Sequence, residues 1–106
     1  MRVAFPPGEM RPVGTKADGC NVELSWVDPD DGGSPITKVK VEVRSKGQKF
    51  YALDCAASPC VVPMRKLYQF PYSLRPGDLV VARAHAQNAE GWGKLSPINT
   101  EGAKMA

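Results

Sequence analysis

The feature that most constrains the fold is a two-residue alternation between apolar and charged side chains. It is clearest over residues 36–46, ITKVKVEVRSK, where Val39, Val41 and Val43 are separated by charged residues. A period of two places successive side chains on opposite faces of a β-strand. The segment is therefore predicted to be a strand whose valines face a core and whose charged residues face solvent.

The same period recurs at residues 20–26, CNVELSW, and at residues 79–88, LVVARAHAQN. Residues 3–19 begin with a Pro-rich lead-in, which a weaker strand pattern follows. Further weak strand patterns lie within residues 49–54, 61–74 and 94–102. Ten prolines and ten glycines are spread along the chain, as turns between short strands require. About seven short strands separated by turns are typical of an all-β, Ig-like antiparallel β-sandwich.

The inward positions of these strands form the predicted core. Its members are Val22, Leu24, Trp26, Val39, Val41, Val43, Val80, Ala82 and Ala84. Cys20 occupies the same alternating face and is expected to act as a small buried hydrophobe. The alanines leave space for larger side chains, because protein interiors tolerate few voids. The candidates to fill that space are Trp26, Leu67, Phe70 and Tyr72.

Length and charge limit the possible classes of protein. The 106 residues fit a single domain over 1–106, with a lead-in at about 1–9 and a tail at about 101–106. The net charge is +3, and the basic residues are dispersed rather than gathered in a run with aromatic residues, so nucleic acid is not an expected partner. No segment approaches the roughly 20 apolar residues of a membrane-spanning helix, so membrane insertion is not expected.

Two long stretches and a weaker Pro-rich start resemble the fibronectin type III family, and together they cover nearly the whole chain. Residues 22–44, VELSWVDPDDGGSPITKVKVEVR, resemble the family's strand-B tryptophan, its Pro-Asp-Gly-Gly loop and its long strand C. Residues 74–96, LRPGDLVVARAHAQNAEGWGKLS, resemble the run from the turn between strands E and F to strand G. The resemblance implies a seven-stranded fibronectin type III-like sandwich with protein partners, either neighbouring tandem domains or identical copies.

The chain departs from this family in two places. Val80 stands where the family usually has a tyrosine whose hydroxyl bonds to the backbone, so that hydrogen bond is expected to be absent. The insert CAASPC, residues 55–60, is not a general family feature.

Two loops at one end of the predicted sandwich are the candidate contact surfaces. They are VDPDDGGSP, residues 27–35, and NAEGWG, residues 88–93; their candidate contact residues are Asp30, Asp31, Glu90 and Trp92. Trp92 either packs on a neighbouring strand or on the N-terminal segment, or it serves as an aromatic anchor at an interface, where tryptophan is enriched. The aspartates lack the spacing of an EF-hand calcium loop and suit the backbone hydrogen bonds of turns.

The cysteines and the histidine carry the remaining chemistry. Cys55 and Cys60 flank a short insert and are predicted to form a disulfide, which implies an oxidising compartment. The alternative is a pair of reduced thiols in a cytosolic protein. His85 is expected to be exposed on the outer face of its strand, with no nucleophile or carboxylate nearby in sequence that suggests catalysis. No catalytic residue, cofactor or metal site is predicted, because a structural zinc site needs four ligands with recognisable spacing.

These observations favour a non-catalytic structural or adhesive protein-interaction module, one repeat unit of a larger extracellular or cell-surface protein. Three alternatives stay open. They are a subunit of a self-assembling extracellular filament, a module of an intracellular giant scaffold protein, and an accessory domain of a larger enzyme. A filament subunit would polymerise with rising concentration, and a cytoplasmic module would keep its cysteines reduced.

Overall fold

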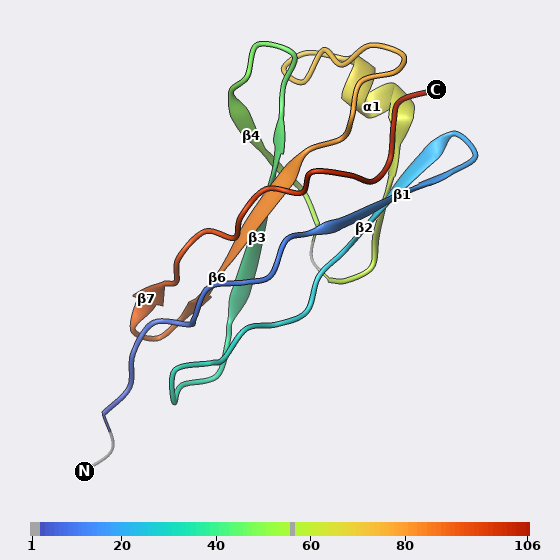
Figure 1. The fold of residues 1–106 in the computed structure, drawn as a ribbon. Helices are drawn as coiled ribbons and strands as arrows, with labels where there is room; N and C mark the ends of the chain where they lie inside the picture. Colours follow the sequence, from blue (N-terminus) through green and yellow to red (C-terminus); the bar gives the residue numbers. More distant parts are fainter. Residues whose placement is uncertain (1–2, 56) are drawn as a thin grey trace.

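Seven strands in the described part of the chain form two antiparallel sheets that face each other. The computed structural model describes residues 3–55 and 57–106. The three-stranded sheet has the order β1-β2-β5 and consists of β1 (Gly14–Asp18), β2 (Asn21–Ser25) and β5 (Cys60–Pro63). The four-stranded sheet has the order β4-β3-β6-β7 and consists of β4 (Phe50–Leu53), β3 (Lys38–Arg44), β6 (Ala82–Asn88) and β7 (Gly91–Trp92) (Figure 1). The predicted all-β sandwich is confirmed.

The core lies between the two sheets, where the alternating residues meet. Each strand turns one face toward the opposite sheet, so every second side chain is buried. The fully buried members of the expected core are Val22, Leu24, Val41, Val43, Val80, Ala82 and Ala84. Trp26 and Val39 are half-buried and pack against them.

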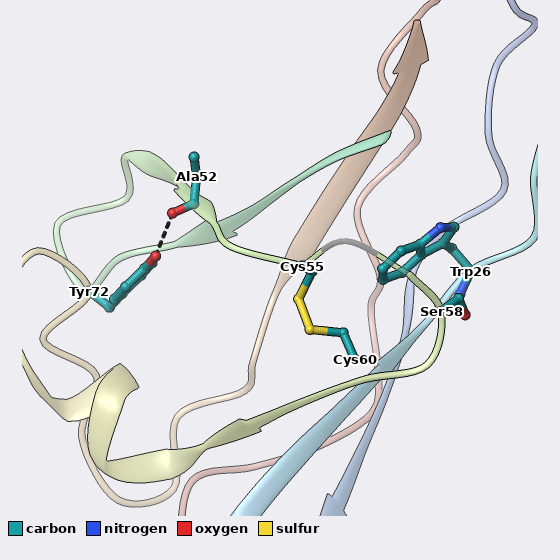
Figure 2. The surroundings of a disulfide bond; sticks show 6 residues. All are labelled: Trp26, Ala52, Cys55, Ser58, Cys60 and Tyr72. Carbon is teal, nitrogen blue, oxygen red and sulfur yellow. Dashed lines mark hydrogen bonds between the residues drawn. A yellow bond between two sulfur atoms is a disulfide. The ribbon is translucent and has the colours of Figure 1, made fainter. Parts of the chain in front are cut away.

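Larger side chains fill the space that the alanines of β6 leave. Leu67 and Tyr72 are buried, as expected, but Phe70 is 89% exposed, so the expectation that it fills the core is wrong. Residues 70–72 form a turn, and within this turn it is Tyr72 that points inward. Its hydroxyl donates a hydrogen bond to the main-chain oxygen of Ala52 at 2.5 Å (Figure 2). Tyr72, which lies outside β6, thus donates a hydrogen bond to the backbone. Val80, at the position where the family usually has a tyrosine, is buried.

A short helix, α1 (Met64–Tyr68), follows β5, where the sequence pattern predicted further strand. Pro63 ends β5 because proline has no amide hydrogen to donate to a ladder. Met64 and Leu67, three positions apart on one helical face, are both buried. α1 spans five residues, and no helix in the described ranges is long and apolar enough to cross a membrane.

After β7 the chain continues beside β6, but side chains take over part of the hydrogen bonding. Ser96 Oγ accepts a hydrogen bond from the amide of Ala84 at 2.9 Å, and Asn99 Oδ1 accepts one from the amide of Ala82 at 2.8 Å. Pro97 lies between them and has no amide hydrogen, which interrupts a regular ladder. The amide of Ser96 also donates to the Ala84 oxygen at 2.8 Å, so the last strand predicted within 94–102 is an extended segment joined to β6 through both backbone and side chains.

Cys20 is exposed, not buried as the alternation suggested. The register of β1 and β2 pairs Asp18 with Asn21, which leaves Gly19 and Cys20 as a two-residue hairpin turn. Gly19 has a φ of 59°, in the left-handed region that such turns use. The alternation does not continue through a turn, so the Cys20 thiol lies at the surface.

Candidate functional site

The two candidate loops and the N-terminal segment meet at one end of the sandwich. We call residues 3–8, 27–35 and 88–93 the loop end; the opposite end, with α1, the β1–β2 turn and residues 103–106, is the helix end (Figure 1). Asn88, the last residue of β6, is 4% exposed and connects all three segments of the loop end. Its Nδ2 donates to the main-chain oxygens of Phe5 and Asp31, each at 2.7 Å, and its Oδ1 accepts from the amide of Glu90 at 2.8 Å. One buried side chain therefore holds the loop end together.

The loop at 27–35 is shaped by its own aspartates. Asp30 Oδ1 accepts a hydrogen bond from the amide of Gly32 at 2.9 Å, and Asp31 Oδ1 accepts one from the amide of Gly33 at 2.8 Å. Both glycines have positive φ, 71° and 93°, which other residues rarely adopt. The amide of Phe5 donates to the Gly32 oxygen at 2.9 Å, so the N-terminal segment lies along this loop. Within the described ranges, no group of three or more acidic, His or Cys side chains is placed to hold a metal ion.

Trp92 lies in β7 rather than in a loop, and it stacks on His85 of β6. The two ring centroids are 4.2 Å apart, and the ring planes are 20° from parallel. Since Asn88 pairs with Gly91, the hairpin turn is reduced to residues 89–90. The prediction that residues 88–93 are a loop throughout is therefore wrong. Trp92 is 38% exposed, so one side of the indole contacts His85 while part of the ring stays accessible.

His85 is half-buried beneath Trp92, not exposed as the sequence suggested. Its Nε2 is buried and has no hydrogen-bond partner among the residues that the structure describes. Burial lowers the pKa of the imidazole below its ordinary value of 6.5, although the Gly93 backbone and the Glu42 carboxylate act in the opposite direction. The neutral ring is therefore favoured, and it supports the indole as an uncharged platform.

The outer face of the four-stranded sheet carries basic side chains next to Trp92. Lys38, Lys40 and Trp92 border a shallow hollow of about 460 Å³. Glu42, the acidic residue between these lysines and Arg44, accepts a hydrogen bond from Arg83 Nε at 2.8 Å. The Glu42 carboxylate is thus already paired, and Asp54 is the acidic residue that lines the hollow together with Lys38, Lys40 and Trp92.

The predicted Cys55–Cys60 disulfide is formed, and it closes the crossing from one sheet to the other. Cys55 follows β4 of the four-stranded sheet, Cys60 begins β5 of the three-stranded sheet, and their Cα atoms are 5.7 Å apart (Figure 2). Ser58 Oγ, inside the insert, accepts a hydrogen bond from the amide of Trp26 at 2.9 Å. The insert is therefore tied to both sheets at the edge of the core.

Comparisons with known proteins agree with this architecture, although no family model matches the chain. A curated Xenopus laevis protein, "Cell adhesion molecule-related/down-regulated by oncogenes", is 33% identical over 94 residues. The match takes in 89% of this chain but 7% of that protein, so the chain spans a small part of its relative.

Solved structures share the fold over nearly the whole chain. A crystal structure of consecutive titin domains matches with a TM-score of 0.73 at 24% identity, covering 98% of this chain and 34% of that one. The sixth fibronectin type III domain of human fibronectin type III domain containing protein 3 matches with a TM-score of 0.72 at 15% identity, covering 99% of this chain and 92% of that one.

Proposed function

We propose that this chain, which belongs to the fibronectin type III family, is a non-catalytic structural or adhesive module of a larger extracellular or cell-surface protein. Residues 1–106 would form one domain of that protein. The module would bind protein partners through the loop end, with Trp92 as the anchor.

The observation that carries the proposal is the way in which Trp92 is held. The indole is exposed enough to be contacted, yet its position is fixed by the His85 stack and by the pairing of β7 with β6. An aromatic side chain that is ordered before binding loses little conformational entropy when a partner covers it. Tryptophan is also enriched among the residues that dominate binding energies at protein interfaces. A fixed, accessible indole is thus a suitable anchor.

The polar surroundings of the loop end suit the rim of such an interface. Asp30, Asp31 and Glu90 are all exposed, and the backbone beneath them is fixed by Asn88 and by the aspartate turns. Interfaces commonly place charged residues around a buried aromatic centre, where they guide orientation more than they add affinity. The carboxylates of Asp30 and Asp31 therefore serve both loop shape and partner choice in this proposal.

The disulfide supports the extracellular setting. Disulfides form and persist in oxidising compartments and are rare in the cytosol. Cys55 is buried and bonded to Cys60, so the disulfide packs against the core instead of lying on the surface. The curated relative is described as cell adhesion molecule-related, which agrees with this setting.

The proposal is tested by binding of the purified chain, displayed in several copies on fluorescent beads, to intact cells of its source. We expect binding that protease treatment of the cells removes and that Trp92→Ala weakens about tenfold, as loss of an interface anchor does. Phe70→Ala is the matched control, because Phe70 is an exposed aromatic residue that follows α1 at the helix end. Equal binding by wild type and Trp92→Ala, or equal loss in both variants, would contradict the proposal.

A further inference from the structure

The two ends of this sandwich carry opposite charge. Exposed carboxylates gather at the loop end: Asp28, Asp30, Asp31 and Glu90. Exposed cations gather at the helix end: Arg65, Lys66, Arg75 and Lys104. The ion pairs found in the described residues include none of these eight side chains. The molecule extends over 53 × 24 × 21 Å, and Figure 1 shows the two ends at opposite extremes of the long axis.

Minority charges at each end do not reverse this polarity. Arg11 lies beside Asp28 and Asp30 and Lys38 lies near Trp92 at the loop end, while Asp18 and Glu101 lie toward the helix end. Asp78 and Glu9 are each already paired, with Lys46 and Lys94. Each end therefore keeps an excess of its own sign among the described residues.

The helix end also contains an apolar groove. Pro63, Met64 and Tyr68 line the groove with Cys20 and Ala106, and its volume is about 600 Å³. The Tyr68 hydroxyl donates a hydrogen bond to the main-chain oxygen of Ala106, which holds the C-terminal residue against α1. Arg65 lines the same groove, so its apolar floor has a basic border.

The loop end presents apolar side chains that match this groove. Val3, Phe5 and Val27 are 67%, 62% and 70% exposed, and they stand among the acidic residues of that end. Exposed apolar side chains within a charged border commonly mark a protein contact. The loop end thus offers apolar projections bordered by negative charge, and the helix end offers an apolar hollow bordered by positive charge.

We infer that copies of this chain associate end to end, with the loop end of one copy seated in the helix-end groove of the next. Two loop ends would repel each other, and so would two helix ends, because like charges facing each other cost free energy. Only the unlike pairing brings opposite charges together, and it leaves one unused end on each copy. Such a heterologous contact produces an open chain rather than a closed dimer.

This inference rests on the proposed function as a protein-interaction module and names a partner for it, a second copy of the same chain. The ends of a domain this narrow bury little area, so association between separate copies is expected to be weak. Copies held in one polypeptide or on one surface would meet at a much higher effective concentration.

Charge reversal tests the inference with sedimentation velocity of the purified chain up to about 1 mM, where weak contacts are populated. We expect the average mass to rise with concentration at low salt and less so at high salt. Asp28→Lys with Glu90→Lys, or Arg65→Glu with Lys66→Glu, should each weaken association at least tenfold. These side chains are exposed and form none of the hydrogen bonds of the described residues, so the fold is kept.

The decisive variant carries both reversals, since its two ends are again complementary with the signs exchanged. It should recover the association of the wild type to within about threefold. A chain that stays monomeric, or a doubly reversed chain that stays as weak as the single ones, would overturn the inference. If such a chain still binds cells through Trp92, the proposed function stands without it.

A disulfide cross-link tests whether the loop end of one copy reaches the helix-end groove of the next. Cys20 borders the groove and is a free thiol, so it can report a neighbour that enters. Wild type is mixed with a variant that carries Cys20→Ser and Val27→Cys, and the mixture is oxidised gently. End-to-end seating predicts a mixed dimer, in which Cys20 of the wild type is bonded to the thiol introduced at position 27 of the variant. This mixed dimer should exceed both symmetric dimers, and a merely statistical mixture contradicts the inference.

Discussion

The side-chain amide nitrogen of Asn88 lies 2.7 Å from the main-chain oxygen of Phe5, a residue 83 positions earlier in the sequence. This hydrogen bond fixes the N-terminal segment on the far end of β6. It is one of three that the buried Asn88 side chain makes, and together they connect the N-terminal segment to both candidate loops. The shape of the loop end therefore depends on a side chain that contributes nothing to its outer surface.

Asn88→Ala should lower the free energy of unfolding by about 2–3 kcal/mol, because it removes three hydrogen bonds, each of which contributes about 1 kcal/mol net. Urea unfolding followed by tryptophan fluorescence measures the change. Gln87→Ala, the neighbouring half-buried position, is the control and should cost less than about 1 kcal/mol. A similar cost in both variants would show that the Asn88 hydrogen bonds do not hold the loop end.

Gly32→Ala should destabilise the fold by about 3 kcal/mol, through positive φ and through steric conflict together. A Cβ at Gly32 would collide with the main-chain oxygens of Phe5 and Pro6. Gly77→Ala is a matched control, since Gly77 also has positive φ, 85°, but no atom within 4 Å of the added Cβ. Its cost should be about 1 kcal/mol, from backbone strain alone. Equal thermal stabilities of the two variants would exclude the close contact at Gly32.

His85 should titrate below pH 6.5, because burial beneath Trp92 disfavours the charged ring and lowers its pKa. The unfolded chain then binds the proton more readily than the folded one. The stabilising contribution is present above pH 6.5 and is lost as the pH falls from there through the lower folded pKa. Since the sequence has one histidine, a proton NMR titration assigns the pKa without ambiguity.

The same titration has an internal control. Trp92→Ala uncovers the imidazole and should move the His85 pKa back toward 6.5, while Phe70→Ala should leave it unchanged. A folded-state pKa at or above 6.5 in the wild type would contradict the buried stack.

Tyr72→Phe should cost about 1 kcal/mol, the usual net value of one hydrogen bond, because the Ala52 oxygen loses its donor while the ring stays packed. Tyr51→Phe is the matched control: Tyr51 contacts Tyr72 edge to face, but its hydroxyl forms none of the hydrogen bonds found in the described residues. Thermal unfolding of both variants measures the difference. A cost for Tyr51→Phe as large as that for Tyr72→Phe would assign the effect to ring packing.

Much of the sandwich could be predicted because its strands repeat a simple period. The sequence revealed β3 through Val39, Val41 and Val43, because every second side chain of a strand points to the same face and this face is the buried one. The period says nothing about where a strand ends. Cys20 continues the pattern of β2 in sequence but lies in a turn, and only the register with β1 shows this.

The candidate site depended on long-range pairing that a single sequence does not display. The His85–Trp92 stack requires the register of β6 and β7, and the role of Asn88 requires contacts across 83 and 57 positions. α1 escaped prediction because one helical turn offers only Met64 and Leu67 as a pattern, and Pro63 could be read as a break within a strand. An asparagine that ends a strand before a Gly-rich turn was the available signal for the Asn88 contacts.

The state of the cysteines in the protein isolated from its native source tests the central claim most directly. Alkylation without reduction, followed by mass spectrometry of the peptides, should find Cys55 bonded to Cys60 and Cys20 alkylated as a free thiol. That result agrees with an extracellular adhesive module. Free thiols at Cys55 and Cys60 would contradict it and would favour an intracellular scaffold instead.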